Sequence, residues 1–255
     1  MHAVPGLEGI IDGRRLHCLV GVMLAVALIG GCTPSNATQA ALTPSPGSEF
    51  DPQRYAFPQE VRPADRYLFY LHGKIIEDQG LPANSPEFGE YRYSEILGAL
   101  EAPGFRVISE QRSSGTNSDV YAHRIADQID TLLAAGVPPG AITVVGASKG
   151  AAIAILVSNL VRNPEVNYVL LGGCNPPTVA ELLHAGIILS GNVLSIYDAP
   201  DVYAGSCKAL LSAFAGSGVG RSSEIVLHVG TGHGILYQPL PEWVDPTLAW
   251  ARQGP

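Results

Sequence analysis

Charged side chains are scarce in this chain, and basic ones are the scarcer kind. Only 15% of the 255 residues are charged, and 15 Lys and Arg stand against 23 Asp and Glu, for a formal net charge of −8. Binding to nucleic acid needs a basic excess that neutralises phosphates, so this balance argues against nucleic acid as a partner. The chain also lacks a repeat of solenoid period and a group of His and Cys at zinc-ligand spacing. We therefore expect one globular domain without a zinc site.

Near the N-terminus, the apolar run at residues 19–29 is too short to span a bilayer as a helix. Two arginines precede it and small residues follow it, which is the order of a secretory signal. Residues 29–32 (IGGC) also resemble the bacterial lipobox, whose cysteine is lipidated. We expect residues 1–31 to be a lipoprotein signal peptide and Cys32 to anchor the protein to a membrane of the cell envelope. The alternative is an ordinary signal peptide with a nearby cysteine.

Residues 32–62 are rich in Ser, Thr, Ala and Pro and have no apolar period. This composition predicts a flexible tether between the anchor and the domain. Residues 63–255 remain as a single domain that is long enough to bury a full hydrophobic core. The sequence does not indicate an oligomeric state.

Strand and helix patterns alternate along this domain. Strands are expected at residues 66–71, 105–109, 141–145, 168–171, 193–197 and 224–229. Helices are expected at residues 93–100, 120–135 (capped by Asn117 or Ser118), 149–161, 179–185 and 245–252 (capped by Asp245, with Pro246 in the first turn). This alternation implies a parallel sheet covered by helices on both faces. In such sheets, ligands bind at the carboxyl ends of the strands.

A serine between two glycines marks one of these strand ends, in the stretch TVVGASKGAA at residues 143–152. Ser148 follows a predicted strand and opens a predicted helix, which is the setting of a nucleophile elbow. Side chains two positions before and after the serine would clash in so sharp a turn, and Gly146 and Gly150 remove them. The start of the helix adds N–H groups beside a developing oxyanion. The alternative is an ordinary glycine-rich loop between strand and helix.

A nucleophilic serine needs a base and a carboxylate that orients the base. His233 lies in the loop GTGHG directly after the last predicted strand, while His72 follows the first one. Two carboxylates follow the strand at residues 193–197, Asp198 and Asp201. The residues by themselves leave both acids open.

Taken together, LHG, GASKG, DAPD and GHG resemble the α/β-hydrolase superfamily, in which the triad follows the order serine, acid, histidine. The resemblance covers residues 67–250 and is to compact members such as dienelactone-hydrolase-like esterases. Their spacing implies Ser148, Asp201 and His233 as the triad, with Asp198 at the turn and in reserve as the acid. It also implies the three-layer α/β-hydrolase fold, here with about six strands, because too few residues precede position 66 for the usual first strand pair.

The stretch LHGK at residues 71–74 matches the oxyanion loop of that family. The match implies that the backbone N–H groups of Lys149 and of Gly73 or Lys74 hold the oxyanion, and that His72 is structural. The short connection at residues 175–192, where lids often insert in this family, implies an open cleft and a small or protruding substrate.

Three basic side chains fall at predicted strand ends, those of Lys74, Arg112 and Lys149. We expect each of them to be a solvated surface charge; the alternative is that they make the mouth of the site locally positive.

Two cysteines lie in the expected mature domain, Cys174 and Cys207. Each lies just beyond the C-terminal end of what should be neighbouring strands, so we expect a disulfide in an oxidising compartment. Two buried free thiols are the alternative.

The sequence predicts an exported serine hydrolase, on the periplasmic side of a membrane or at the cell surface, that works through an acyl-serine. The resemblance to compact esterases implies that the bond it cleaves is a carboxylic ester. No metal or organic cofactor is required for this chemistry. One alternative keeps the triad but passes the acyl group to an envelope sugar or lipid. The other is a non-catalytic lipoprotein that uses the fold as a binding surface.

Overall fold

The core of the domain is a six-stranded sheet. The structure is a computed structural model that describes residues 50–101 and 104–253. The strand order is β4-β1-β5-β6-β7-β8, and every pairing is parallel. The strands are β1 (Arg66–Leu71), β4 (Phe105–Ile108), β5 (Ile142–Ala147), β6 (Asn167–Leu171), β7 (Gly191–Asp198) and β8 (Val219–Leu227). All six were predicted from the sequence, so the expected sheet is confirmed.

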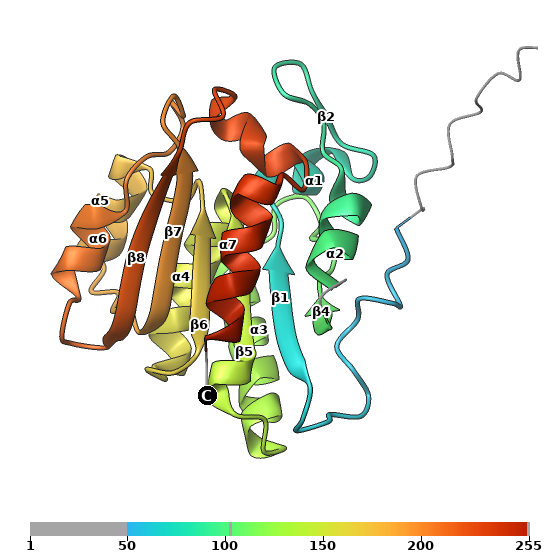
Figure 1. Ribbon diagram of the computed structural model, residues 1–255, viewed down its shortest axis with the longest axis vertical. Helices are drawn as coiled ribbons and strands as arrows, with labels where there is room; N and C mark the ends of the chain where they lie inside the picture. The colour runs from blue at the N-terminus through green and yellow to red at the C-terminus, as the bar shows by residue number, and fades with distance from the viewer. Residues whose placement is uncertain (1–49, 102–103, 254–255) are drawn as a thin grey trace, which may run out of the picture. The chain divides into compact units, whose positions relative to one another are not determined.

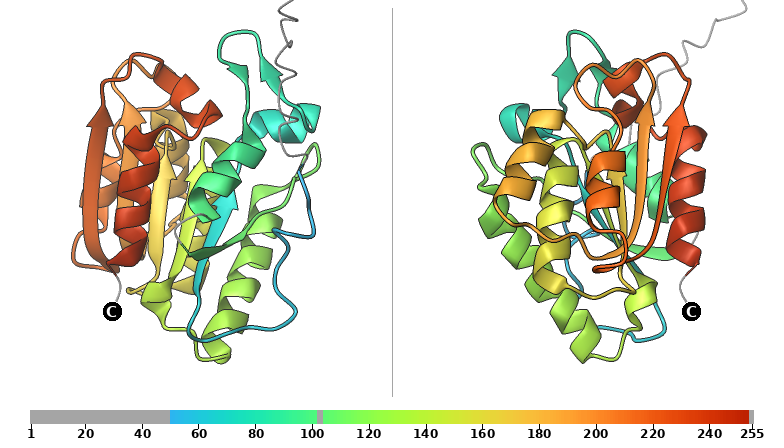
Figure 2. Two further views of the ribbon diagram at one scale, coloured as in Figure 1. Left: turned by 45° about the vertical axis from the view of Figure 1, so that its right-hand side comes forward. Right: turned by 90° about the vertical axis from the view of Figure 1, so that its left-hand side faces the viewer.

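Helices cover both faces of this sheet (Figures 1 and 2). One layer contains α3 (Ser118–Ala134), α4 (Lys149–Val161), α5 (Pro176–His184) and α6 (Lys208–Ala213). The other contains α2 (Tyr93–Glu101), α7 (Pro241–Arg252) and the short α1 (Lys74–Gln79). Alternate residues of β1 serve the two cores: Tyr67 and Phe69 pack under the first layer, and Leu68 and Tyr70 under the second.

The helix boundaries agree with the sequence to within two residues except at α5, which begins three residues earlier than predicted, at Pro176, and at the C-terminus. Asn117 caps α3, because its side-chain oxygen accepts from the backbone N–H groups of two residues in the first turn. In contrast, α7 begins at Pro241 instead of Asp245, and Pro246 lies inside the helix. Pro241 lies in the first turn, where a backbone N–H would have no partner within the helix, so the N–H that proline lacks costs nothing. The sequence pattern predicts Pro246 at this position instead.

Several short elements were not predicted. They are α1, α6, the 3-10 helices η1 (Pro139–Ala141) and η2 (Gly232–Tyr237), and an antiparallel hairpin of β2 (Asn84–Ser85) and β3 (Gly89–Glu90). Each spans two to six residues, which is too short to show a hydrophobic period. Three of them, α1, η2 and the hairpin, lie at the site described below.

Residues 50–62, expected to belong to the flexible tether, pack on the domain. Tyr55 is only 5% exposed, and its carbonyl oxygen accepts from the backbone N–H of Ser109 at 2.8 Å. The Tyr67 hydroxyl accepts from the N–H of Arg62 and donates to its carbonyl oxygen. The domain therefore begins before the expected boundary at residue 63, because aromatic side chains in this stretch find partners on it.

The expected signal peptide (1–31), the lipidation site Cys32 and the first part of the tether lie outside the described residues. Within residues 50–101 and 104–253, none of the helices is both long and apolar enough to cross a membrane.

Candidate active site

Ser148 occupies the sharp turn between β5 and α4. Its φ of 53° and ψ of −117° place it in a region that non-glycine residues rarely adopt. The neighbouring glycines make this turn feasible: a Cβ on Gly146 would lie 2.2 Å from the Gly150 carbonyl oxygen, and a Cβ on Gly150 would lie 1.8 Å from that of Leu71. The backbone therefore has the strand–turn–helix geometry expected from the sequence, with the serine at its apex.

The imidazole of His233 lies between Ser148 and Asp201. Its Nε2 is 3.0 Å from the Ser148 Oγ, and its Nδ1 is 2.8 Å from Oδ2 of Asp201. The carboxylate of Asp201 is fully buried, while the imidazole is 12% exposed. With the proton on Nδ1, the ring donates to the carboxylate and accepts from the serine hydroxyl. These contacts match the order nucleophile, base and orienting acid.

Both oxygens of the Asp201 carboxylate are used. Oδ2 contacts the imidazole, while Oδ1 accepts from the backbone N–H groups of Tyr203 at 2.8 Å and Ala204 at 3.0 Å. The backbone N–H of Asp201 donates to the carbonyl oxygen of Asp198 at 2.9 Å. A tight turn after β7 thus fixes the carboxylate that faces His233.

Asp198 has a different set of partners. Its carboxylate is fully buried and accepts from four consecutive backbone N–H groups, those of residues 229–232, at 2.8–2.9 Å. These residues form the loop between β8 and His233. Of the two acids that the sequence left open, Asp201 contacts the imidazole and Asp198 holds the loop that carries it.

The three residues expected around an oxyanion lie beside Ser148. Gly73 is the N-cap of α1, Lys74 is its first residue, and Lys149 is the first residue of α4. A Cβ on Gly73 would lie 3.6 Å from the Ser148 Cβ, so this backbone approaches the serine closely. The first N–H groups of a helix have no partner within it, which leaves the N–H groups of Lys74 and Lys149 free of intrahelical bonds.

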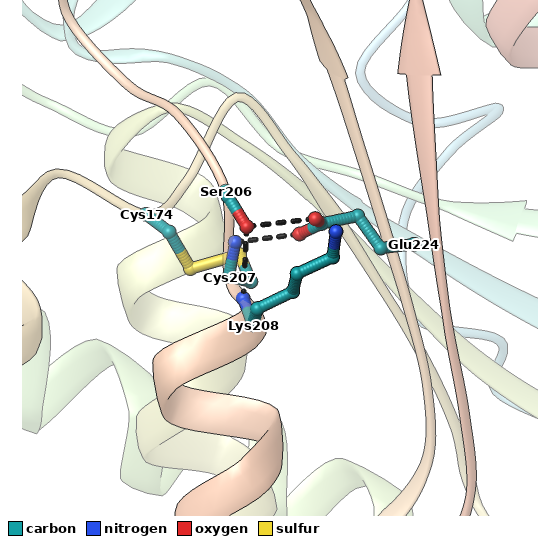
Figure 3. The surroundings of a disulfide bond; sticks show 5 residues. All are labelled: Cys174, Ser206, Cys207, Lys208 and Glu224. Atoms are coloured by element: carbon teal, nitrogen blue, oxygen red, sulfur yellow. Dashed lines mark hydrogen bonds between the residues drawn. A yellow bond between two sulfur atoms is a disulfide. The ribbon is translucent and has the colours of Figure 1, made fainter.

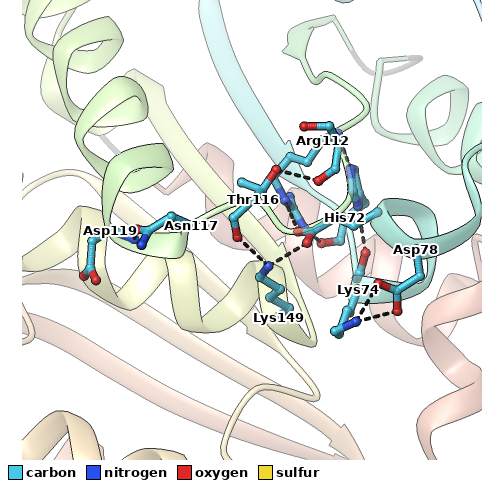
Figure 4. Close-up of polar contacts among 11 residues, drawn as sticks. His72, Lys74, Asp78, Arg112, Thr116, Asn117, Asp119 and Lys149 are labelled. Atoms are coloured by element: carbon cyan, nitrogen blue, oxygen red, sulfur yellow. Dashed lines mark hydrogen bonds and ion pairs between the residues drawn. The ribbon is translucent and has the colours of Figure 1, made fainter.

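A cluster of two buried charges and one partly buried charge lies next to these helix starts (Figure 4). The side chains of Glu77 and Arg112 are 1% and 0% exposed, and the Arg112 Nε donates to the Glu77 Oε1 at 2.6 Å. The Lys149 Nζ donates to the other Glu77 oxygen at 2.6 Å and to the Thr116 carbonyl oxygen at 2.8 Å. We call Glu77, Arg112 and Lys149 the Glu77 cluster.

The expectation of solvated charges is therefore wrong for Arg112 and Lys149. Both find a buried carboxylate on α1, an element that the sequence did not reveal. Lys74 is the exception among the three: its side chain is exposed and pairs with Asp78 one turn along α1 at 2.5 Å.

His72 lies in the same part of the structure, fully buried. Its Nδ1–H donates to the Gly73 carbonyl oxygen at 2.8 Å, and its Nε2 accepts from the backbone N–H of Arg112 at 2.9 Å. The Arg112 guanidinium in turn donates to the His72 carbonyl oxygen. Burial, together with the positive charge of Arg112, lowers the pKa of His72 to about 3. His72 is thus a neutral group that joins the Gly73 backbone to Arg112.

The predicted disulfide between Cys174 and Cys207 is present, with the two Cα atoms 5.2 Å apart (Figure 3). A hydrogen bond adds a second tie beside it, because the Cys174 carbonyl oxygen accepts from the backbone N–H of Gly205. Glu224 on β8 accepts from the backbone N–H of Cys207 at 2.6 Å. The bridge therefore joins the loop after β6 to the end of the segment that follows Asp201.

Sequence reasoning missed three side chains at this site: Glu77, Phe88 and Tyr203. Glu77 lies in the stretch KIIEDQ, where an acid beside two isoleucines was the one signal of a buried carboxylate. Phe88 and Tyr203 lie in turns, and both contact the ring of His233. No group of three or more His, Cys, Asp or Glu side chains within the described ranges is placed to hold a metal ion.

No protein-family model matches the chain, and no curated protein is similar to it in sequence. Among solved structures, SOBER1 of Arabidopsis thaliana is similar at 14% identity with a TM-score of 0.52, over 74% of this chain and 99% of that one. A single-residue variant of SOBER1 has 13% identity and a TM-score of 0.51, over 73% and 98%. Esterase PE8 has 17% identity and a TM-score of 0.49, over 78% and 99%.

The chain has the α/β-hydrolase fold. At these identities the likeness extends to the fold alone, and a shared fold does not establish a shared activity. Any activity has to be argued from the residues at the strand ends.

Proposed function

We propose that this protein is a serine hydrolase that cleaves a carboxylic ester through an acyl-serine intermediate. The observation that carries the proposal is the line of contacts from the Ser148 Oγ through His233 to the buried carboxylate of Asp201, at 3.0 and 2.8 Å. The backbone N–H groups at Gly73, Lys74 and Lys149 supply the oxyanion side.

In the first half of the reaction, the Ser148 Oγ attacks the ester carbonyl carbon while the His233 Nε2 takes the hydroxyl proton. The carbonyl oxygen becomes an oxyanion and accepts from the N–H of Lys149 and from that of Gly73 or Lys74. The bond to the alcohol oxygen then breaks, and His233 returns the proton to the leaving alcohol. Asp201 keeps the imidazole in the tautomer with a proton on Nδ1 and stabilises the imidazolium.

In the second half, a water molecule takes the place of the alcohol. His233 accepts a proton from the water as its oxygen attacks the acyl carbon, and then gives a proton to the Ser148 Oγ as the acyl–serine bond breaks. The carboxylic acid leaves and the free serine is restored. Neither half requires a metal or an organic cofactor.

We also propose that the protein acts outside the cytoplasm. The disulfide supports this location, because disulfides persist in oxidising compartments. The expected signal peptide and the lipid anchor on Cys32 complete the proposal, and both are testable by mass spectrometry of the protein released from membranes.

The function is tested by hydrolysis of short nitrophenyl esters. Ser148→Ala should lower kcat by a factor on the order of a thousand or more, as removal of a triad serine does. Ser212→Ala is the matched control, because Ser212 is an exposed serine on α6; its activity should equal that of the wild type. Full activity of Ser148→Ala would overturn the assignment. If the acyl group passes to a sugar or a lipid and not to water, the protein is an acyltransferase and not a hydrolase.

A further inference from the structure

Three segments that are distant in sequence meet around the ring of His233. They are η2, the β2–β3 hairpin and the loop after Asp201. The Phe88 ring, on the hairpin, lies 6.4 Å from the imidazole, and the Tyr203 ring lies 5.5 Å from it, both tilted. The two aromatic rings also contact each other edge to face, with centroids 6.1 Å apart. These separations lie in the range of attractive aromatic pairs.

Phe88 and Tyr203 are held in place from several sides. The Tyr203 hydroxyl donates to the Glu87 carboxylate at 2.8 Å, which ties the loop after Asp201 to the hairpin. Phe88 also packs on Tyr237 of η2, with ring centroids 5.2 Å apart. The backbone N–H of Arg92, just after the hairpin, donates to the Tyr237 carbonyl oxygen at 2.8 Å. The two rings thus form a fixed rim instead of two free surface side chains.

Core packing does not account for this rim, because much of Tyr203 faces solvent. Tyr203 is 49% exposed, and Phe88 is half-buried. A rigid aromatic side chain offers a large apolar contact area at a small entropic cost. The ring of Tyr203 is therefore available to a ligand that approaches His233.

The chemistry decides which part of the ligand meets the rim. In the mechanism proposed above, the carbonyl oxygen points to the N–H of Lys149 and to that of Gly73 or Lys74, while the leaving oxygen lies at the Nε2 of His233, which protonates it. Side chains that pack around the imidazole therefore border the alcohol portion of the ester.

We propose that Phe88 and Tyr203 form the alcohol-binding side of the site and make the enzyme selective for esters whose alcohol carries an apolar aromatic group. This inference rests on the proposed function. The aromatic group of the alcohol stacks on the ring of Tyr203, which already packs edge to face on Phe88. The hydrogen bond from the Tyr203 hydroxyl to the Glu87 carboxylate keeps that ring in position. Loss of one aromatic contact should reduce the preference by about tenfold.

The test measures kcat/KM of the wild type and of each variant on three esters: benzyl acetate, ethyl acetate and ethyl phenylacetate. Benzyl and ethyl acetate differ only in the alcohol, and ethyl phenylacetate moves the aromatic ring to the acyl side. In Tyr203→Ala, the ratio of kcat/KM for benzyl acetate over ethyl acetate should fall by about tenfold. The ratio of ethyl phenylacetate over ethyl acetate should stay within about twofold, because the acyl group lies away from the rim.

Two further variants separate binding from folding. Tyr203→Phe removes the bond to Glu87 but keeps the ring, so most of the benzyl preference should remain. Val202→Ala is the matched control. Val202 is the residue next to Tyr203, is 85% exposed, and has no aromatic ring to pack on His233. Its ratios should equal those of the wild type. Thermal melting of each variant reports on folding.

The outcomes distinguish the inference from the function on which it rests. If Tyr203→Ala changes the acyl-side ratio, or changes neither ratio, the alcohol-side assignment is overturned while hydrolysis that depends on Ser148 still stands. If the wild type hydrolyses the nitrophenyl esters but none of these three, the inference alone falls. If it hydrolyses neither set, or if Ser148→Ala hydrolyses them equally well, the proposed function and the inference both fall.

Discussion

The two halves of the candidate site are held by different means. The half at the ends of β1 and β5 carries Ser148 and the N–H donors, and the buried charges of the Glu77 cluster brace it. The half at the ends of β7 and β8 carries Asp201 and His233. There the braces are the bonds from Asp198 to the backbone of residues 229–232 and the disulfide.

This contrast follows from what each half has to hold. Oxyanion stabilisation depends on N–H groups that do not move as charge develops, and the Glu77 carboxylate joins α1 to Lys149 at the start of α4. Buried charges are stable only when each has a partner, so this half depends on contacts between distant segments. The histidine half is held by hydrogen bonds between the ends of two neighbouring strands, from the Asp198 carboxylate at the end of β7 to the backbone of the loop after β8.

The largest expected effect separates the two acids of the histidine half. Asp201→Asn should lower kcat by a factor on the order of ten thousand with little loss of stability, because the amide favours the wrong tautomer of His233. Asp198→Asn should lower the unfolding free energy by at least about 1 kcal/mol, since its amide cannot accept all four N–H groups, and reduce kcat less. Ester kinetics and denaturant unfolding measure both. The opposite ranking would make Asp198 the acid.

The next effect tests the nucleophile half. Glu77→Gln leaves the Arg112 charge buried without a carboxylate, which should lower the unfolding free energy by about 3–5 kcal/mol. Asp78→Asn is the matched control, an acid-to-amide change on the next residue of α1. The Asp78 side chain is exposed and pairs with Lys74, so its loss should stay within about 0.5 kcal/mol. Equal stabilities of the two variants in urea would show that the Glu77 cluster does not brace this half.

Loss of the covalent tie should have an effect no larger than loss of Glu77. Cys174 and Cys207 are 33 residues apart, and opening a loop of this length should cost about 3.7 kcal/mol in the double serine variant. Melting temperatures of that variant, and of the wild type with and without reductant, measure the loss. Alkylation of Cys174 and Cys207 in the denatured wild type without reductant, located by peptide mass spectrometry, would show that the bridge does not form.

The smallest expected effect is a pH dependence that originates at His72. Its pKa is about 3 in the folded protein and about 6.5 in an unfolded chain. Between these values the unfolded chain binds more protons, so falling pH favours unfolding, by an amount on the order of 2 kcal/mol at pH 5. His72→Gln should show a flatter decline between about pH 7.5 and 5, whereas His123→Gln, at an exposed site, should follow the wild type. Parallel declines in all three proteins would exclude His72 as the source.

The histidine half was the more predictable from sequence. Asp198, Asp201 and His233 lie in short turn motifs directly after strong strand patterns, and the two cysteines follow neighbouring strands. The choice between the two acids still required the resemblance to a family, because both acids follow the same strand. Only in three dimensions does Asp201 face the imidazole while Asp198 faces the backbone of residues 229–232.

The nucleophile half was predictable at Ser148 and, through the resemblance to a family, at the oxyanion residues Gly73, Lys74 and Lys149, but not at the charges that brace them. The strand before Ser148 and the helix after it are long enough to show their periods, and Gly146 and Gly150 mark the turn. Glu77 could not be assigned, since α1 has six residues and a carboxylate on so short a helix usually faces solvent. The rim residues Phe88 and Tyr203 were missed for a related reason: they lie in turns, and their contact depends on two loops that are adjacent only in the folded chain.

The most direct test of the central claim is covalent labelling with a fluorophosphonate, followed by peptide mass spectrometry. The account predicts one phosphonate per molecule, located on Ser148, with labelling slowed strongly in His233→Ala because the serine then lacks its base. Ser212→Ala should label like the wild type. An unlabelled wild-type protein, or a phosphonate on another residue that persists in Ser148→Ala, would contradict the assignment of Ser148 as the nucleophile.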